Sequence, residues 1–395
     1  MPTFFKTNTS YNWFVPTNIV FGRGAIDKMA ENLPYGENVL IVTTNGSSAK
    51  KSGALDKVTK QLDELEIKYT IFAEITPNPT KDVVMKGAEF ARENQCDLVI
   101  AIGGGSVMDA AKAICCMATN EGDLWDYIAF GTGKGQIPEE MSLPLVCITL
   151  TSGTGSESDD GAVITNTETN EKTAFFGDMP MLAICDPDLT MSVSSELTAY
   201  QGFDALFHSV ECFISNKANL ASDMVAKEAI KNVGGFLARA VKDGKDVEAR
   251  ERVAFASSMS SFSMNLGACT SEHSLEHAMS AYHEKLPHGA GLIMISKAYY
   301  THLIEKGCCP ERFIKMAKLL GNKEAKKPID FIAGLEKLKK DCNVDDLKMS
   351  SYGINKDEFE KMSQNAKDCM WMLFNNDPVE LSVEDCINIY KQSYR

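Results

Sequence analysis

Short apolar runs alternate with amphipathic segments along the first half of the chain. The runs are rich in β-branched residues and lie at 38–44, 68–73, 97–102, 143–150 and 181–185. Their length and composition are typical of strands buried on both faces of a sheet. Strands that alternate with helices predict βαβ units and a parallel sheet, so we expect an α/β fold whose ligands bind at the carboxyl ends of the strands. Residues 162–177 alternate around a polar turn and predict a β-hairpin.

The pattern changes near residue 190, beyond which helical periodicity dominates. The expected helices lie at 191–215, 219–242, 246–266, 271–282, 289–305, 310–320, 328–341, 355–366 and 383–393. We therefore predict two domains, an α/β domain at 1–190 and an all-α domain at 191–395. The length of 395 residues supports two domains, each with its own core.

Two loops rich in small residues follow predicted strands. Gly103–Ser106 precedes a helix, and its glycines would let the backbone approach a pyrophosphate whose charge the helix N-terminus stabilises. A tight strand-to-helix turn is the alternative explanation. Thr151–Glu157 offers hydroxyl and amide donors to the same ligand. The GxGxxG pattern of ordinary Rossmann dehydrogenases is absent from the sequence.

Five of the six histidines fall within residues 203–288. Asp204 and His208 stand four positions apart, as do His273 and His277, so each pair shares one face of a helix. A carboxylate and several imidazoles on separate segments suit a divalent ion such as Fe²⁺ or Zn²⁺. Because a single buried histidine is more often a core residue than a ligand, the cluster gains weight only together with the two loops before it.

Charge and composition limit the kinds of partner that the protein is expected to bind. A net charge of −14 disfavours nucleic acid and anionic membranes, and no apolar run reaches the roughly 18 residues of a membrane span. The N-terminal residues 1–6 lack the pattern of a signal peptide, so we expect a cytoplasmic protein. The twelve cysteines follow neither a disulfide framework nor a CxxC site, which is typical of reduced thiols.

Taken in order, the two loops, the Asp204/His208 pair and the block from His273 to Gly289 resemble the iron-containing (group III) alcohol dehydrogenase family. The resemblance extends from 16–22 to the helical C-terminus. It implies a dinucleotide-binding domain at 1–190, a metal-binding helical domain at 191–395, and a cleft between them that holds metal and nicotinamide. It also implies hydride transfer between the nicotinamide and an alcohol or aldehyde. The same resemblance implies that the chain assembles into dimers or larger oligomers.

The resemblance implies four metal ligands, which are Asp204, His208, His273 and His288. His277 matches a histidine that lies beside the substrate in the family, and we expect it to relay a proton as the catalytic residue. Family members commonly separate the last two ligands by one residue fewer, so either the connecting turn carries an insertion or His277 replaces His273 as ligand. His283 and His302 are expected to be structural or surface residues.

The cofactor is expected to be NADP(H), with NAD(H) as the alternative. NAD-preferring sites commonly place an acid against the ribose 2′-hydroxyl, whereas residues 45–51 contain no acid and two lysines. The residues expected to bind the cofactor are Asn45, Gly46, Ser47, Ser48, Asn78, Gly104, Gly105, Ser106, Asp109, Thr151, Thr154 and Lys172. Asp159 departs from the family, which commonly has a threonine there, and is expected to change contacts near the cofactor.

The expected substrate is a short primary alcohol or aldehyde such as butanol or butanal. Phe207, Met279 and Tyr282 would form an apolar wall, and the segments that bear the ligands contain no arginine to clamp a carboxylate. A glycerol- or diol-type dehydrogenase is the alternative. A sensor or scaffold that lost its chemistry would lack at least one ligand position, and none is missing. The apolar segment 11–15 predicts a homodimer through a twofold contact.

Overall fold

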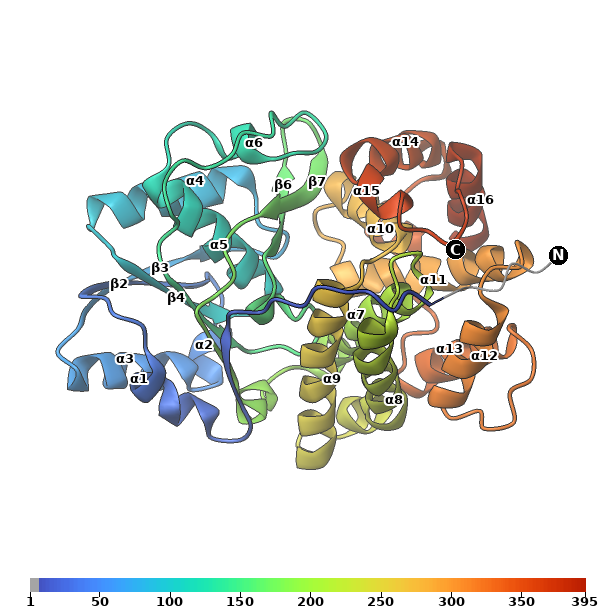
Figure 1. Cartoon of the computed structure of the whole chain (residues 1–395), viewed down its shortest axis with the longest axis horizontal. Coiled ribbons are helices and arrows are strands. Elements are labelled where there is room, and N and C mark those ends of the chain that lie inside the picture. Colours follow the sequence, from blue (N-terminus) through green and yellow to red (C-terminus); the bar gives the residue numbers. More distant parts are fainter. Residues whose placement is uncertain (1–6) are drawn as a thin grey trace. The chain divides into compact units, whose positions relative to one another are not determined.

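The computed structural model describes residues 7–395, so the segment 1–6, on which the prediction about a signal peptide rests, lies outside the described residues. The chain divides into two compact units, Val15–Val193 and Ser194–Arg395, and residues 7–14 belong to the second (Figure 1). No helix in the described part is long and apolar enough to cross a membrane. All twelve cysteines are free thiols.

The first unit contains the predicted parallel sheet. Its strands are β1 (Asn18–Phe21), β2 (Asn38–Thr44), β3 (Lys68–Ile75), β4 (Leu98–Gly103), β5 (Leu145–Thr149) and β8 (Leu182–Cys185). They lie in the order β1-β8-β5-β4-β2-β3, and every neighbouring pair is parallel. The predicted hairpin is also confirmed, as β6 (Gly161–Asn166) and β7 (Glu171–Phe176) pair antiparallel.

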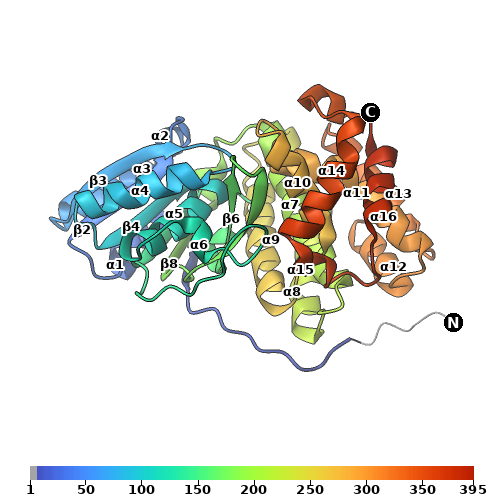
Figure 2. The same cartoon turned by 90° about the horizontal axis from the view of Figure 1, so that it is seen from above.

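Helices cover both faces of this sheet (Figures 1 and 2). On one face lie α1 (Met29–Asn32) and α3 (Ala54–Glu64), and on the other lie α4 (Lys81–Glu93) and α5 (Gly105–Thr119). All six residues of β4 are buried, and alternate ones, such as Ile100, pack with Val58 and Leu62 of α3. Cover on both faces explains why these strands are apolar throughout instead of alternating. The sequence did not predict α2 (Ser48–Lys51) or α6 (Leu124–Tyr127), because a single helical turn carries little periodicity.

The second unit is helical, as predicted. Its longer helices are α7 (Ser195–Ile214), α8 (Leu220–Lys242), α9 (Val247–Leu266), α10 (Ser271–Tyr282), α11 (His288–Glu305), α12 (Pro310–Leu319), α13 (Asp330–Asp341), α14 (Phe359–Cys369) and α16 (Val383–Ser393). Local capping sets several starts: the Asn219 side chain accepts hydrogen bonds from the backbone N–H groups of Ala221 and Ser222 at the start of α8. A short helix, α15 (Trp371–Phe374), was not predicted.

Residues 7–14 belong to a different unit from the one that the sequence predicts, which is the first domain. Asn8 forms a parallel bridge with Asn219, and its carbonyl accepts from the N–H of Leu220 at 3.1 Å. Trp13 packs edge-to-face on Phe262 of α9 with ring centroids 6.0 Å apart. The segment therefore belongs with the helical unit because of contacts far away in sequence, while Phe14 stays 70% exposed.

Candidate functional site

Three helices of the second unit bring the predicted metal ligands together. Asp204 and His208 lie one turn apart on α7, and His273 lies in the first turn of α10. A five-residue turn after α10 leads to His288, the first residue of α11. Asp204 and the imidazoles of His208 and His273 are buried, and the His288 side chain is 24% exposed.

The distances from Asp204 to the three imidazoles are those of ligands around one ion. A single oxygen, Asp204 Oδ1, lies 3.6 Å from His208 Nδ1, 3.5 Å from His273 Nε2 and 3.4 Å from His288 Nε2. Two ligands of a tetrahedral site with bonds of about 2.1 Å lie about 3.4 Å apart. The Asp204 and His273 atoms are buried without a hydrogen-bond partner. Buried polar atoms without partners normally require an explanation, and a cation between them provides one.

Electrostatics in this cluster favour a charged carboxylate. Burial alone would raise the pKa of Asp204, but the imidazoles of His208, His273 and His288 hold it well below its ordinary value. Burial would lower the pKa of His273, whereas Glu211 and Asp204 raise it well above the usual range. The carboxylates of Glu211 and Asp204 thus favour a positive charge at this position, which a divalent ion can supply.

Sequence reasoning missed two buried acids that contact these histidines. Glu211, three residues after His208 on α7, contacts His273 Nδ1, and Glu276, three residues after His273 on α10, contacts His288 Nδ1. Both carboxylates are fully buried. Their spacing of three residues from a predicted ligand on the same helix was the available signal, since such residues share a face.

His277 lies one turn after His273 and is 5% exposed. Its ring centroid is 5.3 Å from that of His288 and 6.2 Å from that of His273. A donor atom of His277 groups with donor atoms of Glu276 and His288, whereas the group around Asp204 contains His273 and His288. This geometry favours His273 over His277 as the ligand beside Asp204.

Other predictions about nearby side chains have different outcomes. His283 pairs with Glu358 at 3.2 Å and His302 with Asp385 at 3.4 Å, away from the cluster. The predicted apolar wall is wrong for Phe207 and Met279, which are fully buried in the helical core. Phe207 stacks on Tyr300, so its ring has no surface to offer a substrate.

The predicted cofactor residues follow adjacent strands of the sheet in the first unit. Asn45–Ser48 follow β2, Asn78 follows β3, Gly104–Ser106 follow β4, and Thr151 and Thr154 follow β5. The strand order reverses between β2 and β4: β3 lies beyond β2 on one side of this point, and β5 lies beyond β4 on the other. Nucleotides bind at such a switch point, beyond the carboxyl ends of the strands.

The two small-residue loops pack directly against each other. A Cβ atom added to Gly104 would lie 2.7 Å from Thr151 Cγ2, and one added to Gly105 would lie 2.5 Å from Thr154 Cγ2. These glycines are therefore required by the packing of the loops, in addition to any approach of a phosphate. The remaining predicted residues also meet: Lys172 Nζ donates to Asn78 Oδ1 at 3.0 Å.

A buried ion pair explains the unusual Asp159. Lys112 of α5, which sequence reasoning missed, contacts Asp159 at 2.5 Å and Ser156 Oγ at 2.9 Å. Ser156 in turn donates to Asp109 at 2.6 Å. Burial would lower the pKa of Lys112, but Asp159 and Asp109 raise it, so the lysine is charged. Asp159 therefore ties the 151–158 loop to the helix that begins at Gly105.

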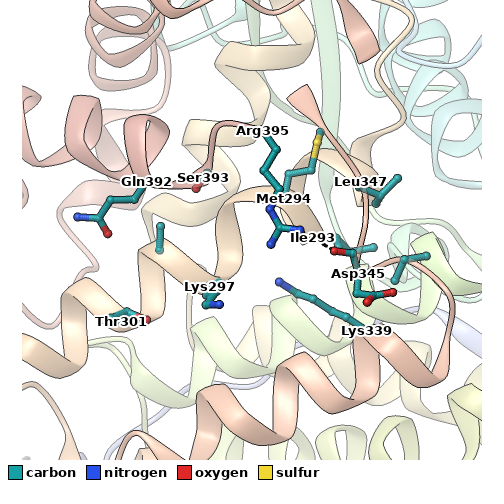
Figure 3. A pocket seen from close by; sticks show the side chains of 12 residues that line it. Ile293, Met294, Lys297, Thr301, Lys339, Asp345, Leu347, Gln392, Ser393 and Arg395 are labelled. Carbon is teal, nitrogen blue, oxygen red and sulfur yellow. Dashed lines mark hydrogen bonds between the residues drawn. The ribbon is translucent and has the colours of Figure 1, made fainter. Parts of the chain in front are cut away.

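A separate cavity of about 160 Å³ opens in the helical unit (Figure 3). Lys297, Lys339 and Arg395 point into it, and Ile293 and Met294 form part of its wall. Both lysines pair with the same carboxylate, Glu336, at 3.3 and 3.0 Å. No predicted site residue lines this cavity in the described part of the chain, so we do not include it in the site.

Comparisons with known proteins agree with this geometry. The family profile described as iron-containing alcohol dehydrogenase matches residues 16–187, and the C-terminal profile of the same family matches residues 198–394. The chain is 33% identical to the 1,3-propanediol dehydrogenase of Klebsiella pneumoniae, covering 90% of this chain and 92% of the relative. It is 31% identical to NADH-dependent butanol dehydrogenase A of Clostridium acetobutylicum, covering 98% and 100%. The structure of an archaeal alcohol dehydrogenase from a Red Sea brine pool superimposes with a TM-score of 0.92 at 32% identity, covering 98% and 100%. The chain therefore belongs to the iron-containing alcohol dehydrogenase family.

Proposed function

We propose that this alcohol dehydrogenase binds one divalent ion, Fe²⁺ or Zn²⁺, through Asp204, His208, His273 and His288. The observation that carries the proposal is the set of three imidazole nitrogens at 3.4–3.6 Å from Asp204 Oδ1. These separations exceed hydrogen-bond lengths and equal ligand-to-ligand distances around an ion. An ion bound there supplies a Lewis acid for the carbonyl or alkoxide oxygen of the substrate.

His277 is the proposed proton relay. It lies beside the ligands without joining the group around Asp204, so its imidazole is available to deliver a proton to the oxygen of the reduced substrate. Its burial limits exchange of that proton with bulk water, and the packing of α10 orients the ring. The protein's own contribution is therefore to position the substrate oxygen and to carry its proton.

The nicotinamide cofactor is proposed to bind the α/β unit at the switch point between β2 and β4. We propose NADP(H) because the exposed loop Asn45–Ser48 and the next residues to Lys51 contain no acid that would repel a 2′-phosphate. The name of the Clostridium relative states NADH dependence, which makes NAD(H) the competing cofactor. The helix N-terminus at Gly105 offers free N–H groups to the pyrophosphate.

The proposed reaction is reduction of a short, uncharged aldehyde such as butanal, and its reverse. The absence of arginine between Arg92 and Arg239, and between Arg252 and Arg312, argues against a carboxylated substrate. The similarity to a 1,3-propanediol dehydrogenase favours a short diol as the second candidate. The two readings differ in one hydroxyl group, so matched substrates of equal length distinguish them.

The proposed assembly is a homodimer or a larger homo-oligomer formed through the N-terminal segment. Tyr11 is 56% exposed and Phe14 is 70% exposed, which leaves apolar rings on the surface of the helical unit. A second copy of the same segment would bury them in a twofold contact. Sedimentation at micromolar protein should give at least twice the 43.3 kDa chain mass, and Phe14→Ser should weaken the association. A strictly monomeric wild-type protein would contradict this proposal.

The activity is tested directly by consumption of NADPH with butanal, propanal and 3-hydroxypropanal, measured with and without a chelator. We expect turnover with the aldehydes, loss of turnover after metal removal, and recovery with Fe²⁺ or Zn²⁺. Full activity in metal-free protein would refute the metal centre. A clearly higher kcat/KM with NADH would refute the cofactor preference while leaving the reaction in place.

A further inference from the structure

Two of the proposed ligands are held at both ring nitrogens. His273 directs Nε2 to Asp204 and Nδ1 to Glu211 Oε1, and His288 directs Nε2 to Asp204 and Nδ1 to Glu276 Oε2. An ionised carboxylate only accepts, so it makes Nδ1 the N–H donor of each neutral ring. The lone pair is then at Nε2, which is the atom that points at Asp204. The two glutamates thus select the tautomer that can ligate.

Glu211 has a second role at the start of α10. Glu211 also accepts from the N–H of Thr270 at 2.6 Å, next to the start of α10, so replacing it would disturb the helix itself. Glu276 approaches His288 across the gap between α10 and α11. A Cβ atom at Gly291, one turn after His288, would lie 2.7 Å from Glu276 Cγ and 2.9 Å from Oε1. Glycine at 291 therefore leaves the space that the carboxylate occupies.

We propose that Glu276 is a positioning residue that holds His288 in the orientation and tautomer needed for metal binding, and that Gly291 provides its space. The inference rests on the proposed metal site. A carboxylate behind a ligand histidine fixes the ring and makes it a stronger donor, and its loss typically costs 10–100-fold in metal affinity. The charge of Glu276 also adds to that of Asp204 near the cation.

The test measures the affinity of the folded, metal-free full chain for Zn²⁺ and Co²⁺ by competition with a chromophoric chelator. Glu276→Gln keeps the shape and removes the charge, and Gly291→Ala keeps the charge but displaces the carboxylate. We expect each to weaken binding by about 10–100-fold and to alter the visible spectrum of the Co²⁺ protein. Melting of the metal-free protein should change little in Glu276→Gln, because the substitution keeps the shape of the buried side chain and the packing around it.

Two matched controls separate this role from general disturbance. Glu272→Gln alters a buried carboxyl group on the same helix, whose pKa burial raises and which contacts Tyr300 instead of a histidine. Gly235→Ala adds a methyl group to a glycine in α8 with nothing within 4 Å of the new atom. Both controls should bind metal as the wild type does.

Each outcome has one meaning. Wild-type affinity in both Glu276→Gln and Gly291→Ala would overturn the inference, even if the wild type binds metal tightly. Failure of the wild type to bind metal at all would instead refute the proposed function. If X-ray absorption of the Zn²⁺ protein shows that Glu276→Gln removes an oxygen ligand, Glu276 binds the ion directly and the positioning role is wrong. If Glu276→Gln does not fold, Gly291→Ala alone decides.

Discussion

Replacing Asp204 should remove the metal-dependent stability of the helical unit. Asp204 Oδ1 is the one atom close to all three proposed histidine ligands, so Asp204→Asn keeps the side-chain shape but removes the charge that they share. At a metal concentration 100 times Kd, binding stabilises the wild type by about 2.7 kcal/mol. For a unit of this size each kcal/mol raises Tm by about 2–4 °C, so the expected shift is about 5–10 °C.

Loss of a direct ligand should weaken binding by more than the roughly 100-fold upper limit for groups behind the ligands. At the same metal concentration the variant is then at most half saturated, its stabilisation is about 0.4 kcal/mol or less, and its Tm shift is below about 2 °C. His208→Ala should behave similarly. The assay is anaerobic calorimetry with and without Fe²⁺ or Zn²⁺, together with metal analysis.

The matched control is His283→Gln, which changes a histidine that pairs with Glu358 outside the cluster. It should keep the wild-type shift and one ion per chain. If Asp204→Asn retains both, Asp204 is not a ligand and the explanation of the unpartnered buried atoms is wrong. If His283→Gln loses them as well, the effect is general destabilisation.

Three further changes test the cofactor, the relay and a buried acid. Gly46→Asp adds a charge at an exposed position where a Cβ is 3.4 Å from Thr44 Oγ1, so it should weaken binding of NADPH roughly fivefold to tenfold more than binding of NADH. Equal weakening of the two cofactors, or the same effect from Gly46→Asn, would contradict a 2′-phosphate at this loop. His277→Ala should lower kcat with butanal by about 10²–10⁴-fold while the protein keeps its metal. Loss of the metal would mean that His277 is a ligand and that the assignment of His273 is wrong, whereas unchanged turnover would exclude a relay. Burial raises the pKa of Asp377 to about 7, so its carboxyl group is neutral in the folded protein below that pH, and the stability it contributes is lost as pH rises through 7. Asp377→Asn should remove this decline, which amounts to about 1.4 kcal/mol per pH unit between about pH 4 and pH 7 and about 4 kcal/mol in all, and an unchanged slope in calorimetry over that range would contradict it.

The parts of the fold that follow from local pattern were predictable. The helix at 220–242 repeats apolar residues at helical spacing and begins at a capping residue, Asn219, so its limits could be predicted closely. Residues 7–14 show the opposite case. Their place in the helical unit depends on Asn219 and Phe262, far away in sequence, and no local signal at the N-terminus indicates those partners.

The candidate site divides in the same way. Spacing on a helix was enough to pair Asp204 with His208, but acids on a helix normally face solvent, so Glu211 and Glu276 were not singled out. The wall prediction failed because neighbours in sequence are not neighbours in space: Met279 lies two residues after His277, and Phe207 directly precedes His208. On a helix, residues two positions apart point in different directions, and Met279 therefore faces the core and not the cluster.

The two ligand-bearing helices repeat one arrangement of donors and acids. On α7, Glu211 follows His208 by three residues but contacts His273 on α10. On α10, Glu276 follows His273 by three residues but contacts His288 at the start of α11. Each acid thus contacts a proposed ligand on the next of the three helices α7, α10 and α11. An ion held by the proposed ligands would link α7, α10 and α11 directly, and the two acids already connect these helices. If the proposed metal site is correct, metal affinity and packing of the helical unit must be coupled: a change that moves either helix interface would move the ligands, and binding of the ion would stabilise the interfaces in return.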